Sequence, residues 1–345
     1  MFFVWTLGIA APAGSPEKYE KNQVRTGPLT DNQRLTMPGP YAHIALAALL
    51  YDNGRFGKAV RPPRHQPLSE LFRFCLLGAV SPDYPNLAVE DAGAPRWADA
   101  MHYQRTGTMI QEGIRQLKQS RNTESFARRL AWFLGYCAHV ISDATIHPVV
   151  RLKVGDYASN VLEHRICEMH QDVYVHELIC PGRQIGHSPD FNTTLASCSH
   201  SSRDRRLHTD ISRFWSDLLL ECHLELYEEN PPDIHGWHGN ALRLIQAGSE
   251  DSRHIFPLAR NILARNGLSY PAAGCPEPAY INGLIVPDGS RMDYGEVFAR
   301  AMRNVEEGWS VIAGAIFDDD LAYLTWFGEW NLDTGCDPSG EQVFW

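Results

Sequence analysis

Apolar residues recur at helical spacing along most of the chain, three or four positions apart, with polar residues between them. This period places the apolar side chains on one face of a helix. Alternation typical of a strand is confined to short stretches such as residues 281–286. The pattern therefore predicts an all-α fold, a compact bundle of many helices. The helices are expected at residues 42–51, 68–80, 98–119, 125–154, 157–178, 212–227, 238–264 and 294–315.

The first part of the chain differs from the rest. Residues 1–36 contain several glycines and prolines but no sustained apolar period, so we expect a poorly ordered leader there. The folded region should begin at Met37. Connections rich in Pro and Ser lie near residues 181–207 and 268–290, and the second of them suggests a boundary. We therefore expect a helical domain at residues 37–270 and a helical C-terminal extension at residues 271–345, packed on that domain.

Composition and charge narrow the classes of function. The 345 residues are 44% hydrophobic and 21% charged, the balance of an ordinary folded protein. With 31 basic and 41 acidic side chains the net charge is −10, which does not favour a broad surface for nucleic acid. Small phosphate esters remain open as substrates, because a bound metal can supply positive charge locally.

The sequence also bears on membranes and location. No segment approaches the roughly 20 apolar residues of a membrane span. The apolar stretch that opens the chain lacks the basic start of a signal peptide. We therefore expect a cytoplasmic rather than a secreted protein. The sequence does not indicate an oligomeric state.

The helix predicted at residues 125–154 carries a row of polar side chains in an otherwise apolar stretch. His139, Asp143 and His147 are four residues apart, so they lie about one turn apart on one face. Imidazole and carboxylate are preferred zinc ligands, and a central carboxylate can bridge two ions. The row therefore favours a transition-metal site. Hydrogen bonds between two neutral imidazoles and the carboxylate are the alternative.

The next predicted helix repeats this arrangement with His164 and Glu168, again four residues apart among apolar residues. Such a pair alone is typical of a surface hydrogen bond. Adjacent antiparallel helices can, however, turn their polar rows toward one shared interior. Because the pair directly follows the first row, we expect both rows to contribute to one metal site.

Three upstream residues are weaker candidates when each is taken alone. Asp83 follows Gly-Ala-Val-Ser-Pro at a predicted helix end, where an aspartate can simply cap a turn. His43 and His102 open helical runs, where a histidine is commonly a core or capping residue. These three residues gain weight as metal ligands only from their order along the chain with the two rows.

Taken together and in this order, the motifs resemble the zinc-dependent phospholipase C family. That family includes bacterial phospholipases C and the N-terminal domain of glycosylphosphatidylinositol-specific phospholipase D. The resemblance runs from about residue 37 to residue 178, and its central H-x3-D-x3-H-P element is specific. The motifs here are His43, the turn that ends in Asp83, His102 before Tyr103, the element from His139 to Pro148, and H-x3-E at His164 and Glu168.

The resemblance implies a helical bundle whose interior holds about three zinc ions, each with about four ligands. By this similarity Asp83, His102, His139 and Asp143 would hold one zinc ion. Asp143 would bridge it to a second ion, which would also take His43. The amine and carbonyl of the amino-terminal residue complete that second site in the family.

The third zinc ion would be held by His147, His164 and Glu168. The similarity also makes Asp83 the candidate base that orients an attacking water molecule. The implied activity is hydrolysis of a phospholipid or a smaller phosphoester. Two alternatives stay open: a zinc-stabilised helical scaffold for binding or assembly without catalysis, and a hydrolase of a small non-lipid phosphoester.

The sequence departs from parts of the family in two ways. Asp143 and His147 are spaced D-x3-H, as in the phospholipase D branch, whereas bacterial phospholipases C and the related zinc nucleases have D-x5-H. This spacing weakens a nuclease interpretation. The other departure is that 42 residues precede His43. In the phospholipase D branch the mature chain begins five residues before its first histidine ligand. The resemblance therefore implies a functional amino terminus at Pro38, five residues before His43, exposed by a start at Met37 and removal of that methionine.

Overall fold

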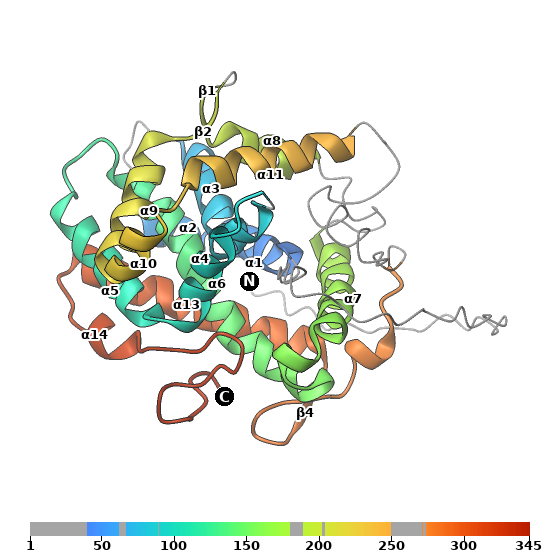
Figure 1. Cartoon of the computed structure of the whole chain (residues 1–345). Coiled ribbons are helices and arrows are strands. Elements are labelled where there is room, and N and C mark those ends of the chain that lie inside the picture. Colours follow the sequence, from blue (N-terminus) through green and yellow to red (C-terminus); the bar gives the residue numbers. More distant parts are fainter. Residues whose placement is uncertain are drawn as a thin grey trace, which may run out of the picture. The chain divides into compact units, whose positions relative to one another are not determined.

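The computed structural model describes residues 40–61, 67–88, 90–179, 189–201, 204–249, 271 and 274–345 (Figure 1). All of them fall within one compact unit, Leu35–Trp345. The predicted leader at residues 1–36 and the predicted terminal ligand Pro38 lie outside the described residues.

The fold is all-α, as the apolar period predicted. The helices of the first half are α1 (Pro40–Asp52), α2 (Arg55–Val60), α3 (Leu68–Gly78), the 3-10 helix η1 (Ser81–Leu87), α4 (Ala94–Tyr103), α5 (Thr106–Gln119), α6 (Phe126–Val154), the 3-10 helix η2 (Tyr157–Ser159) and α7 (Val161–Ile179). The later helices are α8 (Pro189–Ser197), α9 (Thr209–Cys222), α10 (Leu224–Glu229), α11 (Ile234–Ser249), the 3-10 helix η3 (Pro278–Tyr280), α13 (Tyr294–Phe317) and α14 (Tyr323–Trp326).

Strands make up little of the described chain. The antiparallel strands β1 (Ser199–Ser201) and β2 (Asp204–Leu207) form one small sheet. A second antiparallel pair, β3 (Leu284–Ile285) and β4 (Arg291–Met292), lies within and just after the stretch where the sequence showed alternation. Among the described elements no helix is both long and apolar enough to cross a membrane.

Two predicted helices are interrupted. The single helix expected at residues 98–119 is wrong, because the chain turns at Gln104 and Arg105 and continues as a separate helix. Arg105 has φ = 54°, a left-handed conformation that ends one helix and redirects the chain. The helix expected at residues 212–227 is likewise divided at His223. The first break places His102 in the last turn of α4.

Helix α6 lies at the centre of the bundle. Its 29 residues span about 44 Å. It contacts helices α1, α3, α5, α7, α9 and α13. Most of its side chains from Phe126 to Val150 are buried, and a helix surrounded in this way is apolar on nearly all faces. A polar row on this helix is therefore enclosed in the protein interior.

Helices α3 and α6 cross very closely, and glycine makes the approach possible. A Cβ atom on Gly135 would lie 1.9 Å from the carbonyl oxygen of Cys75. A Cβ atom on Gly78 would lie 2.0 Å from the carbonyl oxygen of Trp132. Both distances are far below van der Waals contact, so the two backbones touch through their glycines. This crossing brings η1, which follows α3, against α6.

Helix α13 packs along α6 from the predicted C-terminal extension. The indole Nε1 of Trp309 donates a 2.8 Å hydrogen bond to the carbonyl oxygen of Leu134. The helix begins with a capping box, in which Asp293 and Glu296 each satisfy a backbone amide of the first turn.

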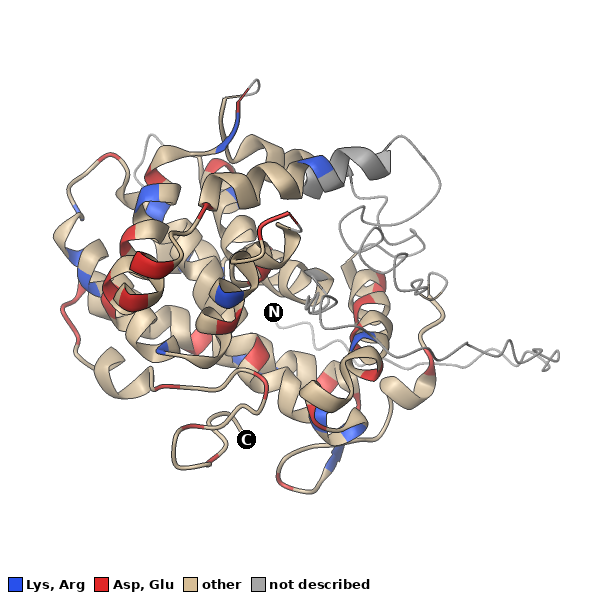
Figure 2. Cartoon of the chain, viewed as in Figure 1, with Lys and Arg blue, Asp and Glu red and all other residues tan. Residues whose placement is uncertain are grey.

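Basic and acidic residues are interspersed over the described elements (Figure 2). The acidic ones are the more numerous in the sequence, 41 against 31.

Gly135→Ala should lower the free energy of unfolding by about 3 kcal/mol or more, because the added methyl group meets backbone atoms that cannot rotate away. The matched control is Gly239→Ala in α11, where the nearest atom is 4.0 Å from the added Cβ. That change should stabilise the protein by about 0.5–1 kcal/mol through helix propensity. Thermal unfolding measures both, and equal melting temperatures for the two variants would contradict the close crossing.

Candidate metal centre

The structure brings together all eight side chains that the sequence singled out in residues 43–168. Each is buried, with at most 7% of its surface exposed. They come from five separate elements, so the site exists only in the folded bundle. His43 lies on α1, Asp83 in η1, His102 on α4, the row of His139, Asp143 and His147 on α6, and His164 and Glu168 on α7.

Asp143 is the centre of this arrangement. Its Oδ2 lies 3.0 Å from Nε2 of His139, one helical turn earlier. Its Oδ1 lies 3.3 Å from Nε2 of His43 and 3.5 Å from Nε2 of His147, one turn later. Nε2 of His102 is 3.7 Å from Oδ2. One carboxylate therefore faces four imidazoles that come from three helices.

Hydrogen bonds to the backbone fix the orientation of two of these rings. Nδ1 of His139 lies 3.0 Å from the carbonyl oxygen of Ala79, and Nδ1 of His102 lies 2.7 Å from that of Ala98. A carbonyl oxygen only accepts, so both Nδ1 atoms carry the proton. In the neutral rings Nε2 then carries no hydrogen and has a free lone pair. The two Nε2 atoms face each other at 3.3 Å.

His43 is fixed in the same way by a serine. The hydroxyl of Ser142 donates a 3.0 Å hydrogen bond to the carbonyl oxygen of His139. Its oxygen therefore accepts from Nδ1 of His43, at 2.9 Å. This leaves Nε2 of His43 as a lone pair directed at Asp143. Ser142 itself is 1% exposed, so neither hydrogen bond competes with bulk water.

The interior thus brings together imidazole nitrogens and carboxylate oxygens that can accept hydrogen bonds, with few donors between them. Both oxygens of Asp83 and Oδ2 of Asp143 are buried and accept no hydrogen bond among the described residues. Nε2 of His102 lies 3.5 Å from Oδ1 of Asp83. Buried carboxylates are stable only when a cation balances them. A divalent metal ion bound by these lone pairs satisfies all of them at once, so the residues fit zinc.

A second group of ligands adjoins the first. Oε1 of Glu168 lies 3.0 Å from Nε2 of His164 and 3.4 Å from Nε2 of His147. Its other oxygen is buried and accepts no hydrogen bond in the described structure. His147 therefore stands between Asp143 and Glu168 and links the two groups. Imidazole nitrogen and carboxylate oxygen are again the donor types that zinc takes.

Two carboxylates of this centre, Asp143 and Glu168, stay ionised. Burial opposes the charge on Asp143, but His139 and His147 outweigh burial and hold its pKa well below the usual range. Burial likewise opposes the charge on Glu168, and His164 and His147 outweigh it and lower that pKa well below the usual range. These two side chains therefore remain negatively charged at physiological pH.

The histidines respond to their surroundings in opposite directions. Burial and the nearby His139 together lower the pKa of His43 to about 4, although Asp143 opposes this shift. Burial also disfavours a charged His147, but Asp143 and Glu168 outweigh it and raise its pKa to about 10. His43 is thus a ready neutral ligand, whereas a metal ion must displace a proton from His147.

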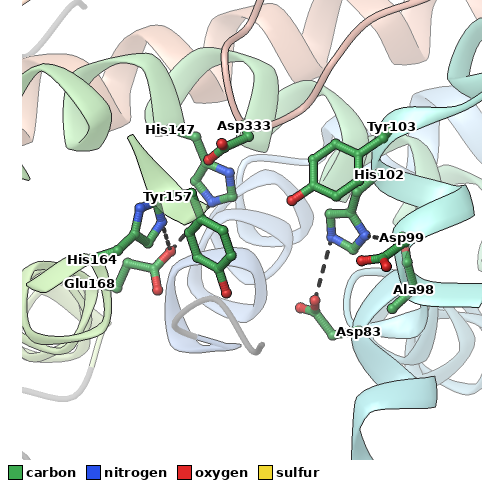
Figure 3. A pocket seen from close by; sticks show the side chains of 10 residues that line it. All are labelled: Asp83, Ala98, Asp99, His102, Tyr103, His147, Tyr157, His164, Glu168 and Asp333. Atoms are coloured by element: carbon green, nitrogen blue, oxygen red, sulfur yellow. Dashed lines mark hydrogen bonds and ion pairs between the residues drawn. The ribbon is translucent and has the colours of Figure 1, made fainter. Parts of the chain in front are cut away.

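A pocket opens beside the two groups of ligands. It encloses about 400 Å³ together with its mouth, and Figure 3 shows the side chains that line it. Ligand side chains form its floor, and Tyr103, 40% exposed, stands at its edge. The lining residues are Asp83, Ala98, Asp99, His102, Tyr103, His147, Tyr157, His164, Glu168 and Asp333.

Sequence reasoning missed the pocket residues Asp99, Tyr157 and Asp333. Asp99 and Tyr157 stand near ligands in the sequence but share no ligand spacing with them. Asp333 is a lone aspartate far along the chain from His147, and no local pattern connects the two. Only the tertiary path of the C-terminal segment brings it to the pocket (Figure 3).

A model of the zinc-dependent phospholipase C family matches residues 42–225, just over half of the chain. The chain belongs to the zinc-dependent phospholipase C family. The match contains all eight of the gathered side chains, from His43 to Glu168, and the predicted resemblance is confirmed. Comparison with curated proteins and with solved structures gave no significant match.

Membership in the zinc-dependent phospholipase C family agrees with the geometry of the centre. Within the described residues, three sets of side chains have ligand atoms within 4.8 Å of one another. The sets are His43, His139 and Asp143; Asp83, His102 and His139; and His147, His164 and Asp333. The individual ligand roles, and that of Pro38, remain predictions.

Ser142→Ala should weaken zinc binding by about 10- to 100-fold, because the hydroxyl holds His43 in the ligating orientation. Helicity should change little, since only one buried hydroxyl is removed. The control is Ser310→Ala on α13, whose exposed hydroxyl donates to the carbonyl oxygen of Glu306. Competition against a chromophoric chelator measures the affinity. Wild-type affinity in Ser142→Ala would show that the serine does not support the site.

Proposed function

We propose that this protein is a trinuclear zinc phosphodiesterase of phospholipase C type. The observation that carries the proposal is the set of imidazole lone pairs that hydrogen bonds aim at the buried carboxylates. Hydrogen bonds to Ser142, Ala98 and Ala79 support this proposal, because a neutral ring that carries its hydrogen on Nδ1 has a free lone pair on Nε2 for a metal ion. Membership of a zinc-dependent family supports the same identity for the metal.

The geometry supports a division of the ligands into three sites. Asp83, His102, His139 and Asp143 would hold the first zinc ion. His43 and Asp143 would hold the second ion, with Asp143 as the bridge. The proposed terminal ligand of the second ion is Pro38, through its amine and carbonyl.

His147, His164 and Glu168 would hold the third zinc ion. Zinc supplies two things when it is bound: it lowers the pKa of a coordinated water to about 7, and it neutralises the oxygens of a phosphoryl group. The side chains of the pocket would then position the substrate phosphate against the ligands. One side chain would also accept the proton of the attacking water.

Asp83 is placed to move that proton. It is 1% exposed at the floor of the pocket, and no hydrogen bond of the described residues restrains its carboxylate. A water molecule attacks phosphorus, and the bond between phosphorus and the leaving oxygen breaks. The proton of the water passes to the Asp83 carboxylate, which returns it to the leaving oxygen, so that an alcohol departs and Asp83 is again ionised. Asp83 is thus proposed as both ligand and base.

The pocket limits what part of a substrate can enter. The pocket is small and is lined by proposed ligands, so we propose that it takes the phosphodiester group of a substrate rather than a whole lipid. The acyl chains of a phospholipid would remain outside, beyond Tyr103. The proposed substrate is therefore a phospholipid or a smaller phosphoester that shares the phosphodiester core.

The purified protein should retain about three zinc ions per chain after dialysis, because eight buried side chains, with Asp143 shared by two ions, would supply most of the about four donors that each zinc ion takes. Elemental analysis gives the stoichiometry. The zinc-loaded protein should hydrolyse phosphatidylcholine or a chromogenic phosphodiester, lose activity with a chelator and regain it with zinc. A protein that holds zinc but turns over neither substrate would favour the non-catalytic scaffold, and a protein without zinc would refute the site.

Asp143→Asn should be the most damaging single ligand change, lowering the phosphodiesterase rate by about 100-fold or more while helicity is kept. The amide loses the negative charge proposed to hold two dications about 3.5–4 Å apart. Two zinc ions should therefore weaken together.

Glu168→Gln is the matched comparison, because it removes a carboxylate that would touch only the third ion. It should lose one zinc ion. Metal stoichiometry, circular dichroism and the phosphodiesterase rate distinguish the variants. Loss of a single ion in Asp143→Asn, or equal losses in the two variants, would contradict the bridging role.

A further inference from the structure

The segment from Phe327 to Trp345, here called the C-terminal strap, is fastened beside the metal centre. The backbone amide of Leu332 donates a 3.0 Å hydrogen bond to the carbonyl oxygen of His102. Two residues earlier, the amide of Trp330 donates to the hydroxyl of Thr106 at 2.7 Å, and that hydroxyl donates to the carbonyl oxygen of Trp330 at 2.8 Å. The strap is thus attached at the start of α5 and at a proposed ligand.

The other side of the strap is attached to α6. Pro148 lacks an amide hydrogen, so the carbonyl oxygen of Ala144 has no helical donor. Gly335 approaches that carbonyl so closely that a Cβ atom would lie 2.4 Å from it. Gly335 has φ = 65°, a left-handed backbone conformation that is strained for residues with a Cβ atom. The indole Nε1 of Trp345 donates to the carbonyl oxygen of Thr145 at 2.9 Å.

These attachments hold Asp333 over the second group of ligands. The carboxylate of Asp333 has a ligand oxygen within 4.8 Å of ligand nitrogens of His147 and His164. Figure 3 shows it on the strap beside His147, facing the pocket. The backbone amide of Asp333 donates to the side chain of Asn331 at 3.0 Å. No hydrogen bond or ion pair in the described part of the chain engages its carboxylate.

The third zinc ion has one coordination position that the proposed protein ligands leave open, and Asp333 can fill it. His147, His164 and Glu168 supply three protein donors to the third zinc ion. Zinc in a structural site takes four protein donors, whereas in a catalytic site the fourth position is left to water or substrate. Asp333 lies where a fourth donor is needed, and its oxygen type suits zinc.

We infer that Asp333 is a fourth protein ligand of the third zinc ion, so that metal binding holds the C-terminal strap closed over the pocket. The inference rests on the proposed zinc occupancy and extends it to a residue outside the matched region, residues 42–225. A substrate phosphate and Asp333 then compete for one coordination position. Entry of the phosphate requires the aspartate to leave the ion, which loosens the strap.

Asp333→Asn and Asp333→Ala test this assignment, with Glu341→Gln as the control. Glu341 is an exposed carboxylate on the same strap, and its side chain does not line the pocket. Both Asp333 variants should bind one of three zinc ions at least about 10-fold more weakly in chelator competition. Hydrogen exchange of residues 327–345 should slow on zinc addition in the wild type and in Glu341→Gln, but not in the Asp333 variants.

The outcomes separate this inference from the proposed function. A wild-type chain that binds no zinc overturns both. Three zinc ions with unchanged affinity in both Asp333 variants overturn the ligand assignment alone. Weaker zinc binding with normal zinc-dependent protection of the strap also overturns it, because Asp333 would then act through its charge and not as a tether. Circular dichroism of the zinc-free variants checks that the bundle itself is intact.

Discussion

The burial of the Asp143 carboxylate within α6 constrains the rest of the molecule. A charge in an apolar interior must be balanced by a cation nearby. Four imidazoles face this carboxylate, and a zinc ion held between them is the cation we propose. Those imidazoles come from helices α1, α4 and α6, so the helices must pack closely enough to deliver them. The glycine crossing of α3 and α6 serves the same end, since it brings Asp83 and the carbonyl of Ala79 to the centre.

The metal centre is specified as much by its supporting hydrogen bonds as by its ligands. Ala79, Ala98 and Ser142 contribute no donor atom to a metal, yet they decide which nitrogen of each ring carries the hydrogen. The arrangement therefore has little freedom to rotate its ligands. A preformed set of lone pairs binds a metal ion without the cost of reorienting side chains.

The sequence predicted the parts of this site that lie within one helix. His139, Asp143 and His147 recur every four residues, so helical geometry alone places them on one face. The all-α class also followed from local periodicity. Features that depend on tertiary packing were not predictable: the left-handed turn at Arg105, the support from Ser142, and the position of Asp333. The last two depend on residues distant in the sequence, which leave no periodic signal, and a left-handed arginine has no distinctive residue type to mark it.

The position of Asp333 along the chain has a consequence for protein synthesis. The eight proposed ligands up to Glu168 leave the ribosome first, and Asp333 follows about 165 residues later. At roughly 5–20 residues per second this delay is on the order of 8 to 33 s, longer than most helical domains need to form. If Asp333 is the fourth ligand, zinc would enter the site before the strap is synthesised, and the strap would then close behind it. Release of the metal from the finished protein would have to reverse that last step first.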